Sequence, residues 1–139
     1  MERRDYLLLE IEKIGLVLTA IKQKLFGGKE NLAITVNKQM EETKDILLNG
    51  LNFEFDKFLT LDMDESIQYL DSFNGFNVEN TDELAGFFLG LGIKDNSSPS
   101  KEYLEKALQL YTISNLKSKT YSMEREMHIM KIKNALESI

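Results

Sequence analysis

Apolar residues recur every three or four positions along the beginning of the chain. From residue 7 to residue 25 the steps are four, three, four, three and four, which is the spacing of one face of an α-helix. We therefore predict a first helix over about 5–26 that ends at Gly27-Gly28, because glycine can take the left-handed conformation of a helix end. The residues of this face, here called the first-helix seam, are Leu7, Ile11, Ile14, Leu18, Ile21 and Leu25.

Helical periodicity continues through most of the chain, which contains a single proline. The short glycine link predicts that the first two helices form an antiparallel hairpin. Phe53 and Phe55 alternate as in a strand, but no second strand pattern can pair with them, so 51–61 is predicted as a short helix or turn. The other helices are predicted over 30–48, ended by Asn49-Gly50, and over 62–73, 80–90, 99–114 and 122–138.

Polar residues mark where several of these helices begin. Asp62 and Glu65 have the spacing of a capping box, in which each side chain accepts a hydrogen bond from the backbone of the other residue. Asn80 is predicted to cap the next helix. Ser98 is predicted to cap the one after it, with Pro99 in the first turn, and Ser122 to begin the last.

These elements predict an all-α fold of five to six helices in a single domain, 1–139. An N-terminal antiparallel hairpin is expected to pack on a second helical hairpin that is followed by a final helix. Neither part alone has enough apolar residues for an independent core. The predicted parts are the N-terminal hairpin at 1–50, short helices at 51–78 and the C-terminal helices at 79–139.

The first-helix seam needs a partner, and a membrane, the rest of the chain and a second copy are the three possibilities. Its longest run without a polar or charged residue, Ile14–Leu18, is about a quarter of the ~20 residues that a membrane-spanning helix needs. We therefore exclude a membrane span. The coiled-coil spacing favours a homodimer through the seam, and a hairpin within one chain remains the alternative.

The net charge of the chain is −6, with 23 acidic and 17 basic residues. Nucleic-acid binding requires clustered Lys and Arg, so we do not expect it. The basic residues are interleaved with acids, as in Glu124-Arg125-Glu126, which is typical of a solvated helix face. The absence of cysteine excludes disulfides and thiolate chemistry and fits a cytoplasmic location.

The segment 82–114 resembles one degenerate tetratricopeptide repeat, in which small residues let two helices approach and large residues fill the groove between them. The resemblance implies a C-terminal helical hairpin on which the last helix stacks. The residues that carry it are Leu84, Phe87, Phe88 and Leu91 in the first helix and Leu104, Ala107, Tyr111 and Ser114 in the second.

The whole chain is similar to a family of uncharacterised bacterial proteins that begin with the helix pattern DYLxxxIExIGxxL and end in such a hairpin. This resemblance implies no activity. Its residues here are Asp5, Tyr6, Leu7, Ile11, Glu12, Ile14, Gly15 and Leu18.

Catalytic and metal-binding patterns are scarce. His128 is the single histidine, and Glu124 precedes it by one helical turn. Two ligands do not make a metal site, so we interpret them as an exposed pair. Asp62 and Asp64 do not belong to a complete calcium loop, and a helix cap explains them. No acid, base and nucleophile converge, so we predict a protein that is not an enzyme and has no cofactor.

Aromatic residues concentrate between 53 and 88, where they could line a ligand pocket or, as we favour, fill the core. Met123, Met127 and Met130 step by four and three, which also favours a core face over an adaptable binding surface. Gly86 and Gly90 are predicted to permit close packing of a neighbouring helix. The candidate pocket residues are Phe53, Phe55, Phe58, Tyr69, Phe73, Phe87 and Phe88.

Two functions follow from these patterns. The first is a non-catalytic protein–protein interaction or scaffold module that forms a homodimer through the first helix. The alternative is a small-ligand sensor or enzyme accessory subunit, with an aromatic-lined pocket between the hairpins. The partner and the pathway are not encoded in any recognisable motif.

Overall fold

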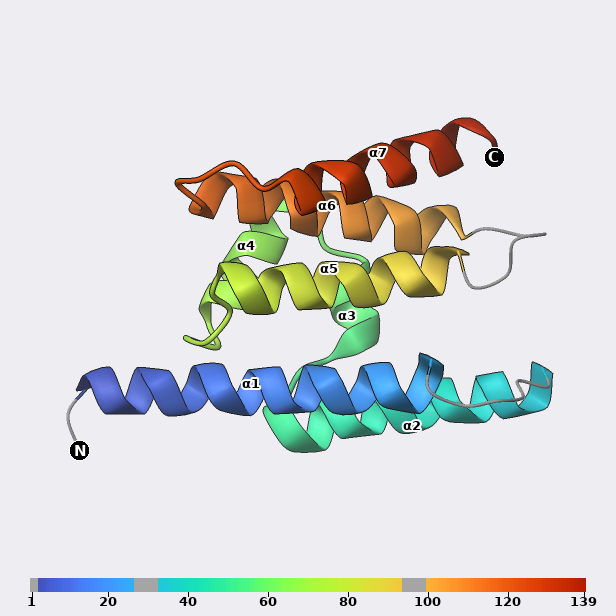
Figure 1. Ribbon diagram of the computed structural model, residues 1–139. Helices are drawn as coiled ribbons and strands as arrows, with labels where there is room; N and C mark the ends of the chain where they lie inside the picture. The colour runs from blue at the N-terminus through green and yellow to red at the C-terminus, as the bar shows by residue number, and fades with distance from the viewer. Residues whose placement is uncertain (1–2, 27–32, 94–99) are drawn as a thin grey trace. The chain divides into compact units, whose positions relative to one another are not determined.

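The computed structural model describes residues 3–26, 33–93 and 100–139, and all regular structure in these ranges is helical (Figure 1). The all-α prediction is confirmed. These ranges contain seven helices rather than five to six, because the segment predicted as a short helix or turn forms a helix of its own. The helices are α1 Arg3–Phe26, α2 Ala33–Leu51, α3 Phe55–Leu59, α4 Met63–Asp71, α5 Val78–Ile93, α6 Lys101–Lys117 and α7 Met123–Glu137.

Contacts along the chain divide it into two compact units, Met1–Gly75 and Phe76–Ile139. The first contains α1 to α4 and the second contains α5 to α7. The single-domain organisation stays a prediction.

In the first unit, α1 and α2 run antiparallel, as the sequence predicts (Figure 1). Lys24 on α1 forms an ion pair with Glu42 on α2. At the C-terminal end of α2, a Cβ atom added at Gly50 would lie 3.2 Å from a methyl group of Val17. The predicted helix end at Gly27-Gly28 lies outside the described residues.

The predicted end of α2 at Asn49-Gly50 is wrong, because the helix continues through both residues to Leu51. The turn occurs at Asn52, whose φ of 57° is left-handed and whose amide donates to the carbonyl of Leu48 over 2.8 Å. Asparagine adopts this conformation more readily than other non-glycine residues. Gly50 instead serves the close approach of α2 to α1.

The N-terminal part of α1 extends past the end of α2 (Figure 1). The segment after α4 approaches α1 there, since a Cβ atom added at Gly75 would lie 2.7 Å from Ile14 Cδ1 and 2.9 Å from the carbonyl oxygen of Glu10. Position 75 therefore has no room for a side chain. The turns of α1 before Glu10 carry the exposed residues described below.

The capping box predicted at the start of α4 is confirmed. Asp62 Oδ1 accepts from the amide of Glu65 over 2.8 Å, and Glu65 Oε1 accepts from the amide of Asp62 over 3.1 Å. The short helix α3 lies just before it and contributes the buried side chains of Phe55 and Phe58. The helix α4 ends before Asn74, which has a left-handed φ of 61°.

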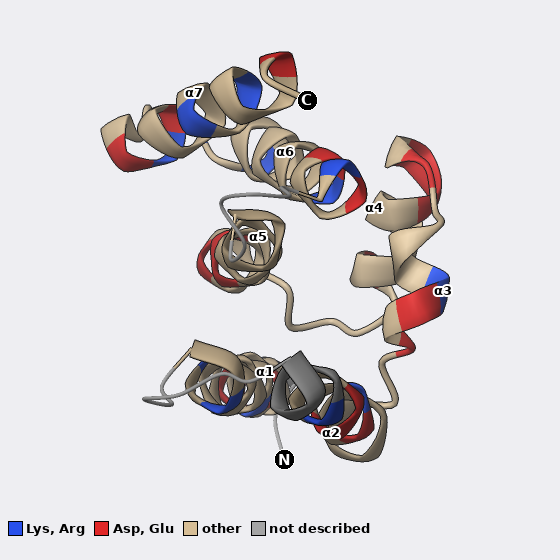
Figure 2. Ribbon diagram, turned by 90° about the vertical axis from the view of Figure 1, so that its right-hand side faces the viewer, with Lys and Arg blue, Asp and Glu red and all other residues tan. Residues whose placement is uncertain are grey.

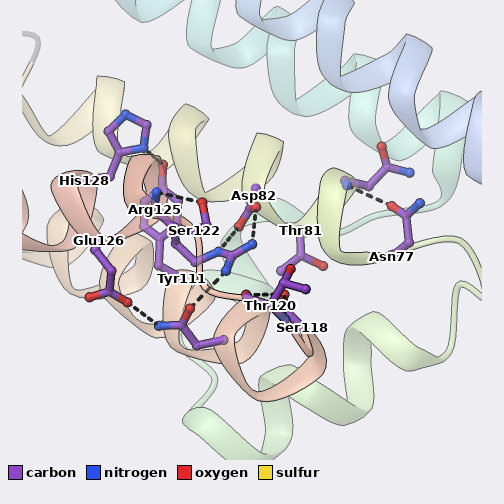
Figure 3. Close-up of polar contacts among 12 residues, drawn as sticks. Asn77, Thr81, Asp82, Tyr111, Ser118, Thr120, Ser122, Arg125, Glu126 and His128 are labelled. Carbon is purple, nitrogen blue, oxygen red and sulfur yellow. Dashed lines mark hydrogen bonds and ion pairs between the residues drawn. The ribbon is translucent and has the colours of Figure 1, made fainter.

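In the second unit, α5 begins earlier than predicted. Asn77, rather than Asn80, caps it, with its Oδ1 accepting from the amide of Asn80 over 2.9 Å (Figure 3). The cap of α6 is Ser100, and the predicted cap Ser98 lies outside the described residues, as does Pro99. Ser122 caps α7 as predicted, accepting from the amide of Arg125 over 3.1 Å.

The close approach within the α5–α6 hairpin occurs at Gly92. A Cβ atom added there would lie 2.7 Å from Cγ and Cδ2 of Leu104. The same atom added at Gly86 would lie 3.6 Å from Tyr111 Oη, which is an ordinary contact. The prediction that Gly86 permits close packing is therefore wrong, because the tight contact lies at Gly92, near the C-terminal end of the helix.

Candidate functional site

The first-helix seam is largely covered within the chain. Ile14, Leu18, Ile21 and Leu25 are 0–1% exposed, Ile11 is half-buried and Leu7 is 38% exposed. A second copy could therefore reach the seam only at its N-terminal end without opening the fold. Of the two partners that the sequence left open for most of the seam, the burial within one chain favours the chain itself.

The exposed apolar residues of α1 gather at its N-terminal end. Tyr6, Leu8 and Leu9 are 50–52% exposed, and with Leu7 they form four consecutive apolar residues, here called the α1 apolar end. Consecutive residues on a helix are about 100° apart, so these four surround the helix axis. A helix that is apolar all round and exposed is typical of a segment that binds another protein.

The candidate pocket residues of the first unit pack against one another. The ring centroid of Phe53 lies 5.2–5.5 Å from those of Phe58, Tyr69 and Phe73. Their tilted and edge-on geometries are the favourable ones for aromatic pairs. Phe55 is buried, with the ammonium of Lys44 5.8 Å from its ring centroid. These rings fill space as core residues do.

Tyr69 has a polar function at the margin of this cluster. Its hydroxyl accepts a hydrogen bond from the amide of Glu54 over 2.8 Å. Burial raises the pKa of the Tyr69 phenol. The remaining candidate pocket residues, Phe87 and Phe88, are buried in the second unit with ring centroids 6.0 Å apart. The candidate pocket thus draws on the cores of two units.

The methionines of α7 are exposed, so the prediction that they form a core face is wrong. Met123, Met127 and Met130 are 64–68% exposed. The buried face of α7 instead carries Ile129 and Ile132. Because α7 has an apolar stripe on each of two opposite faces, periodicity alone could not distinguish the core from the surface. The three methionines are here called the methionine face.

Both signs of charge occur along α7 (Figure 2). On a helical wheel, Glu124 and Lys131 lie on one flank of the methionine face, and Glu126 and Lys133 lie on the other. An apolar stripe between charged flanks is the pattern of a helix that pairs with another helix.

A buried arginine, Arg125, attaches α7 to α5. The interpretation of Glu124-Arg125-Glu126 as a solvated helix face is therefore wrong for Arg125. The Arg125 side chain is 5% exposed, and its Nε and Nη2 donate to the two carboxylate oxygens of Asp82 over 3.0 and 2.9 Å (Figure 3). This two-bond geometry is the strongest form of an arginine–carboxylate pair. Chiefly through the hydrogen bond with Asp82, the pKa of Arg125 is raised.

The guanidinium also connects α7 to α6. Arg125 Nη1 donates to Asn115 Oδ1 over 3.0 Å, and Asn115 Nδ2 donates to Glu126 Oε1 over 3.2 Å (Figure 3). The backbone amide of Arg125 donates to the cap residue Ser122. Arg125 therefore fixes the orientation of α7, and with it the direction in which the methionine face points.

His128 does not act as the exposed partner of Glu124. Its Nδ1 lies 3.0 Å from Tyr111 Oη, and the two ring centroids are 5.4 Å apart (Figure 3). Tyr111 is 2% exposed, and burial, reinforced by the negative charge of Asp82, raises the pKa of its phenol. A neutral tyrosine is a poor base at neutral pH, so the pair serves as a polar contact between α6 and α7.

The sequence also raised the questions of a metal site and of a membrane-spanning helix. Within the described ranges, no group of three or more His, Asp or Glu side chains is positioned to hold a metal ion. Among the helices that the structure describes, none combines the length and the apolar character needed to cross a membrane. Comparisons with protein-family models, curated proteins and solved structures find no match to this chain.

Proposed function

We propose that this chain is a non-catalytic protein–protein interaction module of the cytoplasm that forms a homodimer through its first helix. The observation that carries the proposal is the α1 apolar end. Four consecutive apolar residues, Tyr6 to Leu9, are 38–52% exposed on a part of the helix that extends past α2. Solvent exposure of that much apolar side chain is unfavourable, and a second protein surface would relieve it.

Because most of the first-helix seam is buried within the chain, only the exposed residues of α1 can form the proposed dimer interface. The seam residues Ile14, Leu18, Ile21 and Leu25 lie in the core of the chain. The proposed interface is therefore the α1 apolar end together with Leu16, which is 72% exposed. Two such ends packed against one another would form an isologous contact, which is the commonest symmetry of homo-oligomers.

Leu8→Glu is the variant that tests this proposal, because it places a charge in the middle of the α1 apolar end without touching the buried seam. Its matched control is Ala20→Glu, which introduces the same charge at an exposed position of the same helix. Light scattering of the full chain measures the mass of each. We expect Leu8→Glu to lower the mass of the association product and Ala20→Glu to leave it unchanged.

Equal masses for the wild type, Leu8→Glu and Ala20→Glu at every concentration would contradict the α1 interface. Ile14→Glu is not a useful probe, because Ile14 is 1% exposed and a buried charge would unfold the first unit. Circular dichroism spectra of the two test variants should match the wild type, since both substitutions are at the surface.

We further propose that α5 and α6 form a tetratricopeptide-like hairpin on which α7 stacks. The large residues Leu84, Phe87 and Leu104 and the small residues Ala107 and Ser114 are all buried, as such packing requires. A crystallographic measurement of the angles between the axes of α5, α6 and α7 would test this. Docking of the N-terminal hairpin on these helices likewise remains a proposal.

A further inference from the structure

The methionine face of α7 is a second exposed apolar surface, and it has the spacing of a helix-pairing seam. Met123, Met127 and Met130 are separated by four and three residues, and the next position in the series is Asn134. Together they extend over about 16 Å of helix, at 1.5 Å per residue. Methionine side chains are flexible and adapt to the surface they meet, which suits an interface.

We propose that the methionine face pairs with the same face of a second copy of this chain, with the two α7 helices antiparallel. This inference extends the proposed self-association to a second surface and does not require the α1 interface. The charges beside the methionines are what select a second copy as the occupant.

The antiparallel arrangement aligns the apolar positions. Centred between Met127 and Met130, it sets Met127 of one copy against Met130 of the other, and Met123 against Asn134. Each apolar layer thus has a partner from the second helix, and the polar Asn134 lies at the margin of the interface. Pairing of this kind is the knobs-into-holes packing of coiled coils.

The same arrangement gives every flanking charge an opposite charge. In an antiparallel pair each flank meets the identical flank of the other copy, so Glu124 faces Lys131 and Glu126 faces Lys133. Symmetry makes each of these contacts occur twice. Glu126 also accepts a hydrogen bond from Asn115 within its own chain, so the first pair is the cleaner one to test. A parallel pair would match Glu126 with Lys131 alone among the four residues.

The orientation of α7 is already fixed within one chain. Arg125, Ile129 and Ile132 are buried on the side opposite the methionines, and the bonds from Arg125 to Asp82 and Asn115 prevent the helix from rotating. The methionine face is therefore presented without a change in fold. A contact limited to one short helix buries little area, so the pairing should be weak and depend on concentration.

Charge reversal tests the pairing and its direction. All variants carry Leu8→Glu, which removes association through α1, and the dimer dissociation constant is measured by sedimentation equilibrium. Glu124→Lys should raise that constant about tenfold, because position 124 then faces Lys131 with a like charge in two symmetric contacts. Adding Lys131→Glu to Glu124→Lys should restore the constant to within about threefold, because the charges are exchanged and again opposite.

A parallel pair predicts a different result, because Lys131→Glu would oppose Glu126 and the double variant would stay weak. The charge control is Glu102→Lys, an exposed position on α6. Failure of the double variant to recover would overturn the antiparallel arrangement. A monomer at all concentrations in the Leu8→Glu background would overturn pairing through α7 altogether.

Met127→Glu separates the two interfaces. In an otherwise unmodified chain it should remove association through α7 and leave association through α1, and Leu8→Glu should do the reverse. An unchanged mass with Met127→Glu would reject the α7 proposal alone, and an unchanged mass with Leu8→Glu would reject the α1 proposal alone. Met127 is 64% exposed, so its replacement does not threaten folding.

Discussion

Replacing Asp82 by alanine would leave the guanidinium of Arg125 without its carboxylate. Two of the side-chain hydrogen bonds of Arg125, at 3.0 and 2.9 Å, would be lost, and the bond to Asn115 would remain. Arg125 is 5% exposed, so it would stay buried and charged unless α7 detached from α5. The expected result of Asp82→Ala is a large loss of stability in the second unit.

Removal of one partner of a buried ion pair costs about 3–5 kcal/mol. The Asp82 side chain is 31% exposed, so water can reach the freed guanidinium and reduce this cost. We therefore expect Asp82→Ala to lower the free energy of unfolding by about 2–3 kcal/mol, since water replaces part of the lost interaction. This is a substantial fraction of the net stability of a folded domain, which is on the order of 10 kcal/mol.

Urea unfolding followed by far-ultraviolet circular dichroism measures this loss. The double variant Asp82→Leu with Arg125→Met should be less destabilised than Asp82→Ala, because it leaves no buried charge without a partner. The control is Glu105→Ala, which removes an exposed pair with Lys101 and should cost less than about 0.5 kcal/mol. A cost below about 1 kcal/mol for Asp82→Ala would refute the assignment of Arg125 as the residue that fixes α7.

Two further predictions concern the α5–α6 hairpin. The pKa of Tyr111 is raised in the folded chain. The stabilisation that comes from its neutral phenol is therefore fully present below the pKa of the same group in the unfolded chain, which is near 10. Stability should then fall by about 1.4 kcal/mol per pH unit above about pH 10. Tyr111→Phe should reduce this alkaline slope in urea titrations, and an unchanged slope would exclude Tyr111 as its source. Gly92→Ala should lower the melting temperature, because its Cβ would lie 2.7 Å from Leu104. Gly86→Ala should raise the melting temperature, since alanine favours helix by about 1 kcal/mol and has room there. A change of the melting temperature in the same direction for both variants would contradict the close contact at Gly92.

The sequence predicted well the features that depend on neighbouring residues. The helical spacing of α1 and the capping box of Asp62 and Glu65 are local, and both are present. The hydrogen bonds that complete such a cap involve residues three apart, so no tertiary information is needed. The prediction that α2 ends at Asn49-Gly50 was wrong because that position depends on residues far away in the chain. Gly50 is tolerated inside the helix because α1 packs closely against it, which is a tertiary effect.

The site on α7 could not be predicted from periodicity. Arg125, Ile129 and Ile132 have the same four-and-three spacing as the three methionines, and apolar content alone favours the methionines as the core. What decides the outcome is Asp82, which lies 43 positions away in the chain and neutralises Arg125. An arginine in register with two isoleucines was the one available signal, and it indicates a charge that enters the core with a partner.

The mass of the unmodified chain in solution tests the central claim that its exposed helix faces bind a second copy. Light scattering over a wide concentration range measures that mass directly. We predict a value that rises above the 16.0 kDa of one chain as the concentration increases. A mass of 16.0 kDa at every concentration would contradict the claim.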